Sequence, residues 1–239
     1  MRKATNCLMC GIALFLLSPE ARCSGEVPTL DRMILYYQTQ DLANFEKLWE
    51  QTNQAHSMDG PREMKELLSG FLGAVFRKHP ELLLSHIRSI SIFPKKEHVP
   101  LAIIVWMADS NEGSQLLKEA GYDKLLTSRP PPIAKRHVYS VEDIDFLIGW
   151  FCGSGDRTAL YPIAAELFKA GTPEKDLILE GKAVTSFHEL YVADPAVLPV
   201  LEHCLFGPQL DDATRKKGRI LIETVCDLTL HGRRAYGPN

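Results

Sequence analysis

The chain has 239 residues, of which 45% are hydrophobic and 24% charged, and its formal net charge is −3 at pH 7. This composition is that of a globular protein, and it excludes a collagen, a coiled coil, a disulfide-stapled miniprotein and a polytopic membrane protein. A slightly negative charge also offers no electrostatic footprint for nucleic acid, so we expect no nucleic-acid partner.

Residues 1–25 have the order of parts of a signal peptide. Arg2 and Lys3 form a short basic segment, an apolar run without a charge follows over residues 7–17, and Pro19 then breaks that run. Such a run is too short to cross a bilayer but suits an export signal. We therefore predict a protein that is exported to the periplasm or secreted, with no transmembrane segment in the mature chain. The alternative is a buried N-terminal helix of a cytosolic protein.

Cleavage is expected after Cys23 or after Gly25, and either site would leave an odd number of cysteines in the mature chain. An odd number allows at most one internal disulfide between three thiols, with one thiol left over. All three lie in apolar stretches, where a buried, unreactive thiol is the commoner interpretation. They are Cys152, Cys204 and Cys226.

The remaining chain has the hydrophobic pattern of amphipathic helices. Apolar residues recur at intervals of three and four within residues 42–49, 64–76, 144–151 and 160–168, which is the spacing of one helix face. No stretch alternates apolar and polar residues between hairpin turn signals. We therefore predict an all-α fold in which antiparallel helical hairpins are stacked as an irregular α-solenoid or packed as a compact helical globule.

Capping signals mark the ends of several of these helices. Gly121 stands where a helix C-cap is expected, and Ser140 followed by Asp143 is close to a capping box. The segment 101–107 is continuously apolar and could form a buried strand, but Pro100 before it and its helical neighbours favour a buried helix.

Two segments of the sequence are similar to each other at a separation of 44 residues. Trp106 and Trp150 are each followed by a serine four positions later, an acidic residue two positions further and then a helix that ends in Ala-Gly. A period of this length is typical of HEAT and armadillo repeats. Residues 60–205 therefore resemble α-solenoid proteins in period and helix pairing, which implies stacked helix pairs that present a groove to a protein or peptide. An irregular all-α globule is the alternative.

A proline-rich segment is the best candidate for a boundary within the chain. Three consecutive prolines within residues 128–137 forbid a helix and favour an extended conformation. We expect an N-terminal helical half over residues 26–127, this connector, and a C-terminal helical half over residues 138–239. The alternative is one continuous domain.

No local motif predicts a catalytic, metal-binding or cofactor-binding residue. His188 and Glu189 begin like the zinc motif HExxH, but Val192 stands in place of the second histidine. Cys152 opens the sequence Cys-Gly-Ser-Gly, whereas a nucleophile elbow needs Gly-x-Ser-x-Gly after a strand. We therefore expect no cofactor and name no site residue of these three kinds.

Charged residues gather in two further places. Glu142, Asp143 and Asp145 lie near the start of a predicted helix, where the helix dipole favours negative charge without any acid–base role. Near the C-terminus, a basic cluster is a candidate for contact with an anionic surface, although a solvated helix face is the commoner interpretation. This cluster comprises Arg215, Lys216, Lys217 and Arg219.

The leading hypothesis is an exported, all-helical protein-interaction or scaffold module that is not an enzyme and whose partner is a protein or peptide. The alternative is an exported hydrolase with a dispersed site near Cys152, paired with His137 or His188, or near His188 and Glu189. Such sites are assembled from distant residues and leave no local motif. A third possibility is a purely structural envelope protein.

Overall fold

The computed structural model describes residues 30–54, 61–166 and 174–205, together with 216, 219, 220, 222 and 223. Every regular element within these residues is helical and none is a strand, which confirms the predicted all-α class. The α-helices are α2 (Leu30–Thr39), α3 (Leu42–Gln54), α4 (Arg62–Lys78), α5 (Pro80–His86), α6 (His98–Met107), α7 (Asn111–Glu119), α8 (Val141–Ser154), α9 (Tyr161–Glu166), α10 (Glu174–Ala193) and α11 (Leu198–Leu205). Short 3-10 helices lie between them: η2 (Ile90–Ile92), η3 (Lys95–Glu97), η4 (Asp123–Thr127), η5 (Ile133–Lys135), η6 (Arg157–Leu160) and η7 (Pro195–Val197).

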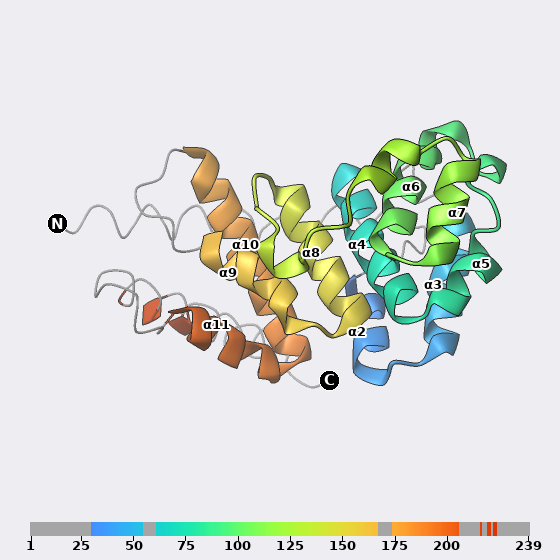
Figure 1. Ribbon diagram of the computed structural model, residues 1–239. Helices are drawn as coiled ribbons and strands as arrows, with labels where there is room; N and C mark the ends of the chain where they lie inside the picture. The colour runs from blue at the N-terminus through green and yellow to red at the C-terminus, as the bar shows by residue number, and fades with distance from the viewer. Residues whose placement is uncertain are drawn as a thin grey trace.

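The helices form an elongated array with α8 near its middle (Figure 1). Helices α3 to α7 lie toward one end of this array, and α9 to α11 lie toward the other. Helix α4 packs against α5, α6 and α8, while α8 also packs against α2 and α10. Helices α4 and α8 are therefore the two through which most of the other elements are joined.

The most intimate contact of the fold lies between α4 and α8, and it depends on glycine. A Cβ atom on Gly70 would lie 2.0 Å from the carbonyl oxygen of Phe146, and one on Gly149 would lie 2.0 Å from the carbonyl oxygen of Leu67. Gly153, one turn beyond Gly149, would meet the backbone of α4 at 2.4 Å. The two backbones therefore touch at these glycines, where a hydrogen atom takes the place of a side chain.

These two helices run parallel, because residues later in α4 meet residues later in α8. Gly149 lies against Leu67 and Phe71, whereas Gly153 lies against Phe71 and Ala74. Their amino-terminal ends consequently lie at the same end of the pair.

Both central helices are buried all round over ten consecutive residues, 67–76 in α4 and 144–153 in α8. The predicted helices at 64–76 and 144–151 are thus confirmed, and the one at 42–49 lies in α3. The segment 160–168 is described as far as residue 166, where η6 and α9 cover it. The spacing of apolar residues predicts one buried face for each of these helices. The structure buries the opposite face as well, because each helix lies between several others.

The apolar segment 101–107 is a helix, as predicted, and forms most of α6. Gly121 ends the following helix with φ +78°. The backbone N–H of Tyr122 donates to the carbonyl of Leu117 at 2.8 Å, and that of Gly121 donates to Lys118 at 3.1 Å. These two bonds form a Schellman motif, which gives hydrogen-bond donors to two carbonyl groups in the last turn of the helix.

The start of α8 is capped by the predicted pair, although in a modified form. The carboxylate of Asp143 accepts hydrogen bonds from the backbone N–H of Tyr139 at 3.1 Å and from the hydroxyl of Ser140 at 3.2 Å. The hydroxyl of Ser140 accepts no hydrogen bond from the first turn, so Asp143 reaches back without the reciprocal bond of a full capping box.

The proline-rich connector 128–137 contains no α-helix, and its one regular element is η5. The helices on its two sides nevertheless meet in the α4–α8 contact. The division into an N-terminal and a C-terminal half stays a prediction, as does the stacking of the helices as repeats.

We expect Gly70→Ala and Gly149→Ala each to lower the free energy of unfolding by at least about 2 kcal/mol, because the added methyl group overlaps a backbone carbonyl and forces the helices apart. Gly181→Ala in α10 is the matched control, since no atom of another described element lies within 4 Å of its Cβ position. That change should raise the free energy of unfolding by about 0.5–1 kcal/mol through helix propensity. Urea denaturation followed by circular dichroism measures all three. Equal stability of the three variants would contradict the glycine contact.

Candidate functional site

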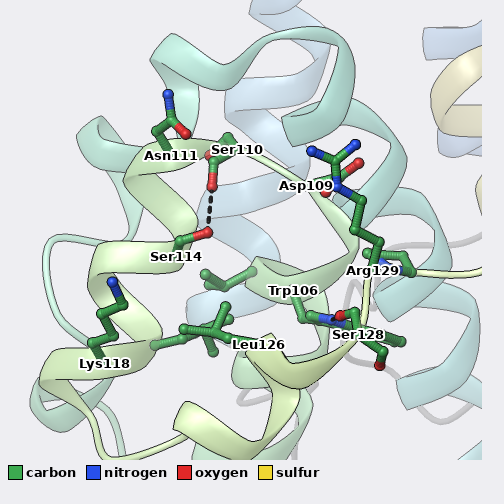
Figure 2. Close-up of a pocket in the computed structure, with 12 residues that line it drawn as sticks. Trp106, Asp109, Ser110, Asn111, Ser114, Lys118, Leu126, Ser128 and Arg129 are labelled. Atoms are coloured by element: carbon green, nitrogen blue, oxygen red, sulfur yellow. Dashed lines mark hydrogen bonds between the residues drawn. The ribbon is translucent and has the colours of Figure 1, made fainter.

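A surface cleft of about 390 Å³ lies between α6, α7 and the start of the connector (Figure 2). This volume falls at the lower end of the range of about 300–1,000 Å³ that is typical of ligand sites. The cleft is lined by Val105, Trp106, Asp109, Ser110, Asn111, Ser114, Leu117, Lys118, Leu126, Ser128, Arg129 and Pro130.

The indole of Trp106 fixes one wall of the cleft. Its N–H donates to the backbone carbonyl of Ser128 at 3.1 Å, across 22 residues of sequence. This bond holds the connector against α6 and leaves the ring half-buried beside Leu126. The tryptophan therefore offers a large apolar surface with a fixed orientation. Tryptophan side chains of this kind are common anchors of binding sites.

The turn into α7 forms the opposite wall, and its side chains are also held in place. The hydroxyl of Ser110 accepts a hydrogen bond from the backbone N–H of Gly113 at 2.9 Å and so caps the helix. The hydroxyl of Ser114 donates to the carbonyl of Ser110 at 3.0 Å (Figure 2). Before the cap, Asp109 turns the chain with φ +51°, a conformation that aspartate tolerates better than most residues.

The charges that face the cleft are not balanced. Asp109 forms an ion pair with Arg77 of α4 at 3.6 Å, and the guanidinium of Arg77 also lies 5.8 Å from the centre of the Trp150 ring. Lys118 and Arg129 are exposed, and neither has an ion-pair partner within the part of the chain that the structure describes. Among the described residues, the cleft therefore has two cations without an ion-pair partner.

A second group of charges surrounds the amino-terminal ends of α4 and α8. Lys182 of α10 donates to one carboxylate oxygen of Asp145 at 2.7 Å. The side chain of Asp145 is 8% exposed, and its other carboxylate oxygen is buried without a hydrogen-bond partner among the described residues. Burial raises the pKa of Asp145, and the nearby Glu63 and Glu142 raise it further, although Lys182 lowers it.

The neighbouring carboxyl groups behave differently because they lie in different environments. The pKa of Glu142 is lowered, chiefly by a hydrogen bond from its own backbone N–H at the start of the helix. Burial raises the pKa of Glu66, although Arg136 and Arg62 act in the opposite direction. Glu142 and Asp143 therefore accept hydrogen bonds at the start of α8, whereas the side chain of Asp145 is buried inside the fold.

Cys152, named above as a candidate nucleophile, is a free thiol with no exposed surface. Burial raises its pKa far above the ordinary range. A nucleophilic cysteine needs an accessible thiolate. The thiol of Cys152 is inaccessible to solvent, and its raised pKa keeps it protonated. The Gly-Ser-Gly sequence after it ends α8, with Gly155 in the left-handed conformation at φ +73°.

The other candidate residues form no metal site in the described part of the chain. His188 is half-buried and Glu189 is exposed on α10, and no group of three His, Cys, Asp or Glu residues among the described positions could hold a metal ion. Of the C-terminal basic cluster, Lys216 and Arg219 are exposed. Several predicted features lie outside the described residues: the predicted signal sequence 1–25, Arg215, Lys217, Cys226 and the side chain of Cys204.

Comparison of the chain with protein-family models, with curated proteins and with solved structures gives no match. Among the described residues, no helix is both long and apolar enough to cross a membrane. The cleft and its charges are therefore the features of the described residues that bear on function.

Replacement of Lys182 by methionine is expected to lower the free energy of unfolding by about 2 kcal/mol at pH 7. This is less than the cost of breaking a fully buried pair, because Lys182 keeps 33% of its side chain exposed. The double variant Asp145→Asn/Lys182→Met should recover most of the loss, since it leaves no buried charge unpaired.

The loss should also depend on pH in one direction. Because the pKa of Asp145 is raised in the folded protein, the fold favours the protonated carboxyl, and ionisation costs stability as the pH rises above the ordinary value of 3.8. The deficit of Lys182→Met should be small in acid and should grow toward neutral pH in urea titrations. A deficit of constant size would contradict this account of Asp145.

Proposed function

We propose that the protein is an exported, non-enzymatic helical module that binds a segment of another protein, or a peptide, in the cleft between α6, α7 and the connector. The observation that carries the proposal is the fixed tryptophan of this cleft, whose indole N–H is bonded to Ser128 while its ring stays half-buried among polar and charged side chains. Tryptophan and arginine are the residues most enriched at the centres of protein interfaces.

The shape of the cleft supports a peptide better than a small enclosed ligand. Exposed side chains form much of its rim, among them Asn111, Lys118 and Arg129. One wall is the extended chain that leads into the prolines, where Pro130 has no backbone N–H to donate. A ligand segment can therefore lie along the wall and be held by side chains, with little reordering of the protein.

Selection from a phage-displayed peptide library on the full chain tests this function. We expect enriched peptides to lose at least about tenfold in affinity when Ser114→Trp fills the cleft, because the indole takes the space of the ligand. Gln115→Trp is the matched control, since residue 115 is exposed on the same helix and does not line the cleft. Failure to enrich any peptide, or equal binding to both variants, would refute the proposal.

Export is the second part of the proposal, and it is supported by the basic, apolar and small-residue order of residues 1–25. Mass spectrometry of the protein recovered from its native host should find a new amino terminus at Ser24 or Glu26, because cleavage is expected after Cys23 or Gly25. A chain that keeps Met1 would refute export without affecting the binding proposal.

A further inference from the structure

We infer that the segment bound in the cleft is acidic and that Lys118 and Arg129 select it. This inference rests on the proposed binding function and adds the chemistry of the partner. It follows from how the charges around the cleft are paired.

Among the described residues that line the cleft, the one carboxylate is already paired with a cation outside it. Asp109 is paired with Arg77, which belongs to α4 and is not part of the lining. The two lining cations lack any such compensation among the described residues. A ligand that enters the cleft therefore meets a net positive charge, which favours carboxylates and disfavours basic segments.

The two cations lie on different elements, and apolar surface lines the cleft beside them. Lys118 is in the last turn of α7 and Arg129 is in the connector. Figure 2 shows Lys118 on one side of the cleft and Arg129 on the other, where its guanidinium is drawn near Asp109, while Trp106 and Leu126 lie along one edge of the space between the two cations. This arrangement fits a short segment in which an apolar side chain is flanked by acidic residues on both sides.

The geometry of the connector makes Arg129 an effective carboxylate ligand. Its neighbour Ser128 is tied to Trp106, and the following proline restricts the backbone of Arg129 to extended conformations. Less conformational freedom is therefore lost when the guanidinium binds, and its planar donors can hold a carboxylate through two parallel hydrogen bonds.

The charge of the whole molecule does not explain such a preference. The chain carries a net charge of −3, so its overall field repels an acidic partner. Selection of an acidic segment has to come from the cleft itself, and it should weaken with added salt because both cations are exposed.

Two fluorescein-labelled peptides test the inference on the full chain by fluorescence anisotropy. One has a central leucine flanked by glutamates and aspartates, and its twin has glutamine and asparagine at those positions. We expect the acidic peptide to bind about tenfold more tightly than its amide twin, the combined effect expected of two exposed ion pairs. That preference should disappear in Lys118→Glu/Arg129→Glu and in the milder Lys118→Gln/Arg129→Gln.

The matched control is Arg88→Glu/Lys95→Glu, which makes the same change of net charge at exposed residues outside the cleft. This control should keep the preference for the acidic peptide. Circular dichroism confirms that each variant is folded, and all four replaced side chains are exposed.

Three results would overturn the inference: equal binding of the two peptides, no binding of either one, or an equal loss in the control pair. The Ser114→Trp variant separates this failure from failure of the binding function. If library peptides of neutral or basic sequence lose binding in Ser114→Trp, the cleft binds peptides but does not select acidic ones. If no peptide depends on residue 114, the binding function itself is wrong.

Discussion

The backbone contact between α4 and α8 is the constraint on which the rest of the structure depends. Gly70 and Gly149 let the two helices approach until their backbones touch, and the side chains around this contact are buried on every side. Because the helices are parallel, the contact also brings their amino-terminal ends together. The carboxyl groups of Glu63, Glu142 and Asp145 therefore influence one another although they are separated by up to about eighty residues.

The same packing leads outward to the cleft. Helix α6 rests on α4, and α7 rests on α6 at Gly113, whose Cβ would lie 2.9 Å from the carbonyl oxygen of Val105. Arg77 at the end of α4 then reaches the turn before α7 and neutralises Asp109. The position and the charge of the cleft are thus set by the central helices, and a ligand would meet a surface that is already organised.

The sequence predicts local structure well because helix formation leaves a periodic pattern and capping leaves residue types. The helices at 64–76, 101–107 and 144–151 and the cap at Gly121 follow from these signals. Pairing of helices leaves no comparable pattern in one sequence. Gly149 stands in a run of large apolar residues. No local feature distinguishes a glycine that faces another backbone from one whose Cβ position is open, such as Gly181.

The cleft escaped prediction for a related reason. Trp106 is visible in the sequence as part of the repeated segment, and Arg129 as part of the proline-rich connector. The hydrogen bond that joins these two segments is a tertiary contact. Asp145 illustrates the opposite error. Glu142 and Asp143 accept hydrogen bonds at the start of α8. Asp145 is instead buried, and Lys182 of α10 packs against it. Residue type and spacing thus identify the groups that carry charge, whereas their exposure and partners, which decide whether a charge binds a ligand or stabilises the fold, arise from packing.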